Sequence, residues 1–94
     1  MVIVGGEFEV DPAQRDAFIA EREAMMRTSR AEDGCLEYTF AADPLAADRV
    51  ILFERWESQE ALDAHLAAFS ARTEITPRSA SITIYDVAGE RRLR

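Results

Sequence analysis

The only histidine of the chain, His65, is the residue whose type is best suited to chemistry. It lies at helical spacing with Leu62, Leu66 and Phe69, which predicts that it belongs to the apolar stripe of an amphipathic helix. An imidazole that faces the interior of a small domain can accept or donate a proton near neutral pH. The alternative is a core histidine whose nitrogens are satisfied by the backbone or a carboxylate, and the spacing alone favours that alternative.

Aromatic and arginine side chains supply candidate contacts to a flat ligand beside His65. The aromatic candidates for the pocket walls are Trp56, Tyr38, Tyr85 and Phe69. Side chains of this kind more often belong simply to the core. Arg55 and Arg72 are candidates to pair with an anionic ligand or a phenolate. Their alternative is pairing with neighbouring glutamates at the surface.

Other reactive side chains carry weaker signals. Glu7, Glu9 and Glu54 lie on expected strands and could be buried carboxylates with a raised pKa, although solvated positions fit them equally well. Cys35 has no base near it in the sequence, so we interpret it as a buried, unreactive thiol. One histidine and one cysteine do not make a zinc site, and no phosphate loop, nicotinamide motif or flavin motif is present. We therefore expect no metal and no cofactor.

The composition describes one small domain. The chain has 94 residues, of which 48% are hydrophobic, and a mean hydropathy of -0.19. Its net charge of -7 repels phosphates, so nucleic acids and anionic membranes are not expected partners. A single cysteine excludes an internal disulfide, and we find neither a signal peptide nor a membrane-spanning apolar run. We therefore expect a cytoplasmic protein, and the use of arginine for all 11 basic residues hints at a bacterial source.

The apolar pattern predicts four strands and two helices. The strands are expected at residues 2–10, 35–42, 49–56 and 81–87. Asp11-Pro12-Ala13-Gln14 is a strong helix start, and apolar residues at helical spacing continue this helix to about residue 30. Ser58 caps the second helix, which reaches Phe69. Residues 1–88 are thus expected to form the domain, and residues 89–94 a flexible, charged tail.

The predicted order of elements is β-α-β-β-α-β, which is typical of an α+β, ferredoxin-like fold. Right-handed crossovers place both helices on one face of a four-stranded antiparallel sheet. The opposite face would then be uncovered, although both faces of the expected strands carry apolar residues. We therefore predict a homodimer in which two sheets pack through their uncovered faces.

Three short stretches form an ordered pattern along the chain. They are Asp33-Gly34-Cys35-Leu36-x-Tyr38, Phe53-Glu54-Arg55-Trp56-Glu57-Ser58 and Ala61-Leu62-x-Ala64-His65-Leu66. In this order and at these distances they resemble the antibiotic biosynthesis monooxygenase family, over residues 2–87. The resemblance implies a dimeric α+β barrel. For the best-known members it also implies cofactor-independent oxygenation of quinols or polyketide phenols by molecular oxygen.

The resemblance also implies roles for particular residues. In such enzymes an electron-rich phenolate reduces oxygen directly, and the protein binds the flat substrate, favours its anion and excludes water. His65 is carried over as the acid-base or hydrogen-bonding group, Trp56 and Tyr38 as walls, and Arg55 or Arg72 as the anion partner. The chain lacks the third helix and the proline-histidine step of common members. It also lacks the second histidine of the haem-degrading branch, which argues against haem degradation.

Three functions follow from these observations. The leading hypothesis is a small quinol or phenol monooxygenase that needs no cofactor. A non-catalytic dimeric ligand-binding or stress-associated domain of the same fold is the alternative, and an isomerase of a small dicarbonyl is the third. A cavity beside His65 that is large enough for two rings favours an enzyme. Closure of that space by Leu62, Phe69 and Tyr85 would disfavour one.

Overall fold

A four-stranded antiparallel sheet organises the computed structural model, which describes residues 1–70 and 72–94. The strands lie in the order β2-β3-β1-β4. Their bounds are β1 Val2–Glu9, β2 Cys35–Ala42, β3 Arg49–Trp56 and β4 Ser79–Asp86. The bounds of β2 and β3 agree with the prediction, whereas β1 ends at Glu9 and β4 begins at Ser79.

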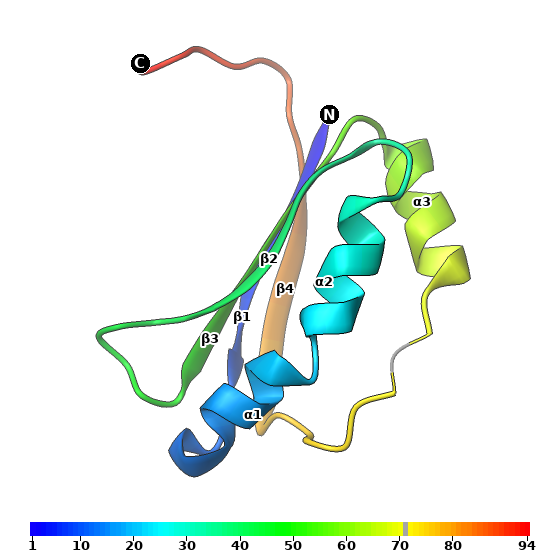
Figure 1. Cartoon of the computed structure of the whole chain (residues 1–94). Coiled ribbons are helices and arrows are strands. Elements are labelled where there is room, and N and C mark those ends of the chain that lie inside the picture. Colours follow the sequence, from blue (N-terminus) through cyan, green and yellow to red (C-terminus); the bar gives the residue numbers. More distant parts are fainter. Residues whose placement is uncertain (71) are drawn as a thin grey trace.

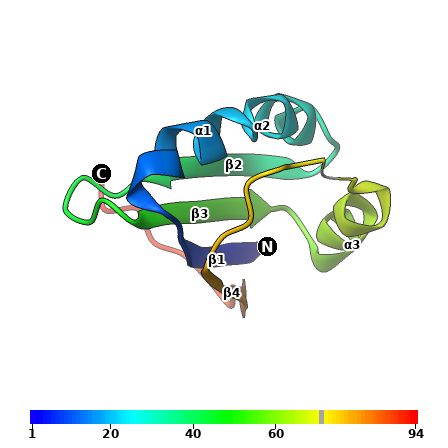
Figure 2. The same ribbon diagram turned by 90° about the horizontal axis from the view of Figure 1, so that it is seen from below.

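All helices lie on one side of the sheet (Figure 1). They are a 3-10 turn η1 at Pro12–Gln14, α1 at Arg15–Ala20, α2 at Glu23–Arg30 and α3 at Gln59–Ala68. Figure 2 shows α1 and α2 beside β2, whereas β4 lies at the opposite edge of the sheet. This arrangement confirms the predicted ferredoxin-like α+β fold. In the described part of the chain, no helix has the length and apolar character that crossing a membrane requires.

The first helical segment is not the continuous helix that the sequence predicted. It is interrupted at Glu21 and Arg22, where the Arg22 N–H bonds to the Ile19 carbonyl three residues before it, at 2.9 Å. The Glu21 carboxylate accepts hydrogen bonds from the backbone N–H groups of Glu74 and Ile75, at 2.8 and 3.1 Å. These contacts tie the interruption to the segment after α3, so the local pattern of residues 12–30 could not reveal it.

The core lies between the helices and the inner face of the sheet. Its largest fully buried side chains are Trp56, Phe18, Leu62, Val10 and Val50. Burial of each such side chain stabilises the fold by roughly 1.5–3 kcal/mol. Because these residues come from α1, α3, β3 and the end of β1, the core depends on contacts between the layers.

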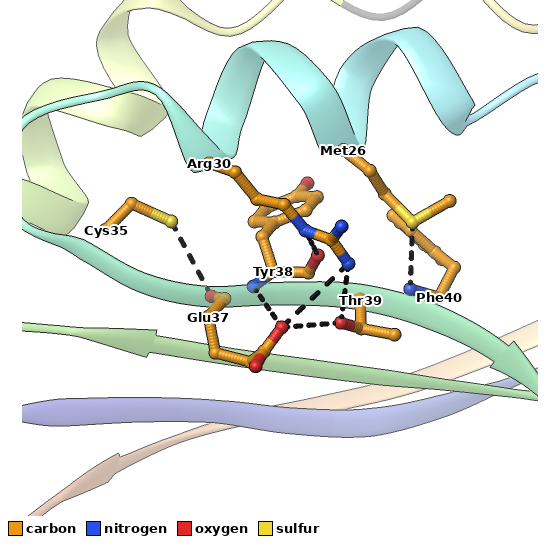
Figure 3. Close-up of polar contacts among 7 residues, drawn as sticks. All are labelled: Met26, Arg30, Cys35, Glu37, Tyr38, Thr39 and Phe40. Carbon is orange, nitrogen blue, oxygen red and sulfur yellow. Dashed lines mark hydrogen bonds and ion pairs between the residues drawn. The ribbon is translucent and has the colours of Figure 1, made fainter.

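The two edges of the sheet differ in how they are covered. Figure 3 shows α2 along β2, with Arg30 Nε donating to the Tyr38 carbonyl oxygen at 2.9 Å. The Phe40 N–H donates to Sδ of Met26 at 3.5 Å, and the Tyr38 N–H donates to Glu37 Oε1 at 3.1 Å. These side chains occupy backbone groups that another strand would otherwise pair with. At the other edge, every residue of β4 is exposed.

A β-bulge between Cys35 and Glu37 interrupts the alternation of β2. Regular alternation along residues 35–42 would place Leu36 on one face with Tyr38 and Phe40. Instead Leu36 is 42% exposed, whereas Tyr38 and Phe40 are buried. A bulge inserts one extra residue into the strand, so Leu36 leaves the buried face while the residues after it keep the predicted one.

The sheet face opposite the helices carries both apolar and charged side chains. Phe53 and Tyr85 lie on it and are 40% and 55% exposed. Ile3 is paired in register with Tyr85, and Arg49 forms an ion pair with Glu7 on the same face. This is the uncovered face that the sequence predicted, and its use in a homodimer stays a prediction.

The paired glycines of β1 lie where β4 approaches closely. A Cβ added to Gly6 would lie 2.2 Å from the Ser81 carbonyl oxygen and 2.7 Å from Cα of Ile82. A Cβ added to Gly5 would lie 3.4 Å from the nearest ring atom of Tyr85. The close backbone approach between β1 and β4 is therefore located at Gly6.

We expect Gly6→Ala to lower the free energy of unfolding by about 1–3 kcal/mol, because β4 must shift to accommodate the added methyl group. Urea unfolding followed by tryptophan fluorescence measures the loss. Gly5→Ala is the matched control, and its change should stay below about 1 kcal/mol. Equal losses in the two variants would contradict the close approach at Gly6.

Candidate functional site

A cavity of about 450 Å³ lies between the sheet and the helices. All four strands contribute to its floor, and its roof is formed by α3, by α2 and by the break between α1 and α2. Its polar lining residues are Arg22, Tyr38, Glu54 and His65. The remaining lining side chains are apolar. A volume of this size and a wall of this kind are typical of sites for small organic molecules.

The cavity opens toward the exposed strand β4. Ile82 and Ile84 of that strand line it and are 44% and 48% exposed, and Leu66 and Phe69 of α3 are 55% and 42% exposed. Leu62 lies deeper and is fully buried. The space beside His65 is therefore open, which is the condition that the sequence analysis set for an enzyme.

His65 is buried in an aromatic cage at the α3 end of this cavity. It is 3% exposed, and its ring centroid lies 4.7 Å from the Trp56 ring. The rings of Tyr38 and Phe69 follow at 5.4 and 5.5 Å. Nδ1 lies 2.8 Å from Oε1 of Glu32. When Glu32 is ionised, Nδ1 carries the hydrogen and donates it, which leaves Nε2 able to accept a proton.

The local sequence of α3 explains how the imidazole reaches this place. The Ser58 hydroxyl accepts the Ala61 N–H at 3.1 Å, which confirms the predicted cap and sets the start of the helix. Leu62 and His65 then fall on the buried side, as the predicted stripe requires. Trp56 ends β3 directly before this turn, so one short segment supplies both stacked rings.

Glu54 is a buried carboxyl group in the floor of the cavity. It is 6% exposed, and its Oε1 accepts a hydrogen bond from Trp56 Nε1 at 2.9 Å. Burial raises the pKa of Glu54, although the hydrogen bond from Trp56 and the nearby His65 oppose this rise. Of the three strand glutamates that the sequence offered as buried carboxylates, Glu54 is the one that lies in the cavity. Burial, together with the Glu54 charge, also raises the pKa of Tyr38, which keeps its hydroxyl protonated.

Arg22 is the polar lining residue of the cavity that the sequence did not indicate. It is 7% exposed, its Cζ lies 3.4 Å from the centroid of the Phe18 ring, and its Nη1 donates to the Phe18 carbonyl at 2.8 Å. Burial lowers the pKa of Arg22, while the Glu21 carboxylate, 3.7 Å away, opposes this change. Arginine nevertheless stays protonated. Its spacing between Phe18 and Met25 matches the inner stripe of the helical segment, and this spacing is the signal that could have identified it.

A second cavity of about 330 Å³ lies between α2 and α3 and has more polar walls. Arg72 and Glu32 line this second cavity, so Arg72 is separated from the larger one. His65, Phe69 and Met25 line both cavities and form the partition between them. The imidazole is thus positioned between an apolar space and a polar space.

Two of the predicted site residues lie on the far side of the sheet. Arg55 follows Glu54 on β3 and therefore points to the opposite face, where it is paired in register with Ile3. Tyr85 lies on that same face, with its ring over Gly5. Of the predicted site residues, His65, Tyr38 and Phe69 line the cavity, whereas Arg55 and Tyr85 lie outside it. Trp56 packs against His65 but is fully buried and does not line the cavity, so it is not the wall that the sequence predicted.

Cys35 is half-buried, and burial raises the pKa of its thiol, in agreement with the interpretation of an unreactive cysteine. Within residues 1–70 and 72–94, no three histidine, cysteine, aspartate or glutamate side chains are grouped so that they could hold a metal ion. The larger cavity offers imidazole, carboxyl, phenol and guanidinium groups.

Known proteins share this sequence pattern and this fold. The family model described as antibiotic biosynthesis monooxygenase matches residues 1–73. The chain belongs to the antibiotic biosynthesis monooxygenase family. The match includes β1, α3 and the residues up to 73, so it contains every lining residue of the larger cavity except Ile82 and Ile84.

Two curated relatives of this family member have similar sequences. An uncharacterized protein of Synechocystis is 32% identical over 93 residues, which cover 93% of this chain and 63% of that protein. "Putative monooxygenase Rv0793" of Mycobacterium tuberculosis is 41% identical over 66 residues, which cover 68% of this chain and 62% of that protein. The matched regions therefore span less than two thirds of the length of these two relatives.

Solved structures confirm the family fold. The structure of Rv0793 has a TM-score of 0.76 and 30% identity to this chain, and the match covers 95% of this chain and 96% of that one. A Deinococcus radiodurans protein named for the same family has a TM-score of 0.86 at 22% identity, and the match covers 100% and 99%. The second likeness is one of fold alone.

The raised pKa of Glu54 predicts how stability changes with pH. Because Glu54 holds its proton more tightly in the folded state, its contribution to wild-type stability falls as the pH rises above the ordinary value of 4.5. Glu54→Gln keeps an acceptor for Trp56 and has no charge to bury. We therefore expect this variant to gain stability relative to the wild type as the pH increases.

Urea unfolding of both proteins at pH values from about 4 to about 8 measures this difference. The exposed Glu60→Gln serves as the surface control on α3. The difference in free energy of unfolding between Glu54→Gln and the wild type should grow in favour of the variant as the pH rises. If this difference stays constant or moves against the variant, the assignment of a buried carboxyl group with a raised pKa is contradicted.

Proposed function

We propose that this protein is a cofactor-independent monooxygenase that oxidises a small aromatic quinol or phenol with molecular oxygen. The observation that carries the proposal is the apolar cavity of about 450 Å³ with a caged imidazole, His65, in its wall. Membership of the family supports a monooxygenase role in general. The quinol or phenol substrate, the absence of a cofactor and an action in the cytoplasm are our proposals.

His65 is the proposed proton acceptor. A phenol in the cavity gives its proton to Nε2, and the resulting imidazolium is stabilised by Glu32, whose Oε1 lies 2.8 Å from Nδ1. The apolar walls keep water away from the phenolate, so its reactivity toward oxygen is not reduced by hydration. The side chains bind the substrate and move protons, while the electrons come from the substrate itself.

The oxygen chemistry balances without an added reductant. The phenolate passes one electron to oxygen, and the resulting radical pair combines at a ring carbon that carries a hydrogen, which forms a carbon–oxygen bond. The hydroperoxide then breaks its oxygen–oxygen bond: the ring carbon loses its hydrogen as a proton, one oxygen atom remains as a carbonyl, and the other leaves as water. The substrate thus becomes a quinone, and all electrons that reduce the oxygen come from the substrate.

The position of His65 between two cavities supports a route for the proton. Glu32 lines the second, more polar cavity, and its side chain is 29% exposed. A proton taken from the substrate on the apolar side can therefore pass through the imidazole toward a carboxylate that solvent reaches. In this proposal Glu32 acts through His65 and is a positioning residue.

We expect oxygen uptake on reduced naphthoquinols and anthrone-like phenols, without added cofactor or metal. His65→Gln should reduce the rate about 100-fold or more, because general acid–base catalysis contributes at least that much. Glu32→Gln should reduce the rate less and move the pH profile of kcat/KM, since the imidazolium loses its carboxylate partner. Asp63→Asn, an exposed change on the same helix, is the control. An oxygen electrode measures these rates.

The same experiments distinguish the monooxygenase from the two alternative functions, a ligand-binding domain and an isomerase. Equal uptake by wild type and His65→Gln, at the spontaneous rate across the panel, would overturn the monooxygenase proposal. Retained binding of the same aromatics would then favour the ligand-binding domain, which the burial of His65 at 3% exposure and its bond to Glu32 also suit. Proton exchange into a dicarbonyl without oxygen uptake would favour the isomerase.

We further propose a homodimer through the uncovered face of the sheet. This face presents Phe53 and Tyr85, both large and more than one third exposed, together with Ile3 and Ile51. Apolar side chains that lie together on one exposed face are typical of an interface between proteins. Packing of two such faces would place the helices and the cavities of both copies on the outside.

Sedimentation velocity should therefore give a mass of twice 10.6 kDa for the wild type. Phe53→Glu places a charge at the centre of the face and should shift the protein toward the monomer mass. Leu45→Glu is the matched control, because Leu45 is 95% exposed in the loop between β2 and β3 and lies away from this face. A wild-type monomer, or a Phe53→Glu dimer of undiminished affinity, would contradict the proposed interface.

A further inference from the structure

The larger cavity contains a buried cation that the proposed oxygen chemistry does not use. Arg22 is 7% exposed and lines the cavity among mostly apolar side chains. Removing a guanidinium from water is costly, and the cost is recovered only when the charge meets a partner. The nearest carboxylate, Glu21, lies 3.7 Å from Nη1 and already accepts the backbone N–H groups of Glu74 and Ile75.

The guanidinium retains donors that the protein does not occupy. Its face lies over the Phe18 ring at 3.4 Å, and Nη1 donates to the Phe18 carbonyl. Among the described residues this is the one hydrogen bond of the Arg22 side chain, although a guanidinium carries five N–H donors. Among the described residues, no nitrogen of Arg22 is both fully buried and without a partner. Because Arg22 lines the cavity, we infer that its remaining donors face that space.

Arg22 and His65 lie at the two ends of a row of aromatic rings. Arg22 Cζ lies 5.7 Å from the Phe40 centroid, the Phe40 and Tyr38 centroids lie 5.9 Å apart, and Tyr38 lies 5.4 Å from the His65 ring. Two rings thus separate the cation from the imidazole. A flat ligand of about two rings, laid along this row, would meet a positive charge at one end and a proton acceptor at the other.

The other ionisable groups of the cavity do not compete with this arrangement. Apart from Arg22 and His65, the polar lining residues are Glu54 and Tyr38, and the Tyr38 ring lies 5.4 Å from the His65 ring. Burial favours the neutral form of each, since the pKa of both is raised. Arg22 is a cationic side chain in the cavity wall at the opposite end, and it favours a ligand with a negative charge there.

We propose that the ligand of this cavity is an aromatic anion, with a carboxylate or phenolate oxygen bound by Arg22 and the opposite ring directed toward His65. This inference deepens the proposed function, because it names the substrate class of the same site: a hydroxylated two-ring aromatic with an acidic group at the far end. The binding of the acidic group does not depend on turnover.

Isothermal titration with the matched probes 2-naphthoate and 2-naphthamide tests the proposal. Wild type should bind the naphthoate about tenfold more tightly or better, because a charge-assisted hydrogen bond replaces a neutral one. Arg22→Gln should remove this preference and leave the affinity for the amide unchanged. Arg27→Gln on α2, which begins directly after Arg22, is the control. The Arg27 side chain is 79% exposed, so this variant should keep the preference.

Three outcomes would each overturn the proposal. The wild type could bind the two probes with equal affinity, the preference for naphthoate could survive in Arg22→Gln, or neither probe could bind. Where Arg22→Gln does not fold, Arg22→Lys replaces it. The lysine ammonium group is a point charge without the planar donor geometry of a guanidinium, so Arg22→Lys should reduce the preference for naphthoate without abolishing it. A further arm with 2-naphthol, titrated with rising pH, distinguishes a phenolate from a carboxylate as the bound group.

The two proposals can fail separately. If the naphthoate preference depends on Arg22 but the protein takes up no oxygen with any quinol, the anion subsite is supported and the monooxygenase proposal is contradicted. If oxygen uptake depends on His65 but the two probes bind equally, the monooxygenase proposal is supported and the anion subsite is contradicted.

Discussion

The packing of Trp56 determines where the candidate site lies. Its indole is fully buried at the end of β3, packs against the His65 ring in a tilted arrangement with centroids 4.7 Å apart, and donates its N–H to Glu54. Tyr38 contacts both rings of this pair, with centroid distances of 6.5 Å to Trp56 and 5.4 Å to His65. Because one side chain connects β2, β3 and α3 in this way, the imidazole and the buried carboxyl group are held in the same part of the molecule.

Uneven coverage of the sheet turns this packing into a cavity. Side chains of α2 cover the outer edge of β2, whereas β4 is exposed along its whole length (Figures 2 and 3). The break between α1 and α2 directs Arg22 into the space that remains. Glu21 holds the chain after α3 across that break. An apolar space with a cation at one end and an imidazole at the other is the result.

Much of the fold could be predicted from local patterns. The bounds of β2 and β3, the Ser58 cap and the inward positions of Leu62 and His65 follow from alternation, capping and helical spacing. The bulge at Leu36 and the break before Arg22 could not be predicted in this way. Both depend on neighbours that are far away in the sequence or in another strand.

The sequence by itself determined the family, the order of elements and the chemical types available, because motif spacing and apolar periodicity are properties of the chain. Only the tertiary structure decided which of these side chains meet. Alternation along β3 separates Glu54 and Trp56 from Arg55, but which of the two sets faces inward depends on the helices that cover that face. For the same reason Arg22 joined the cavity: burial is a property of packed layers and cannot be assigned to a residue in isolation.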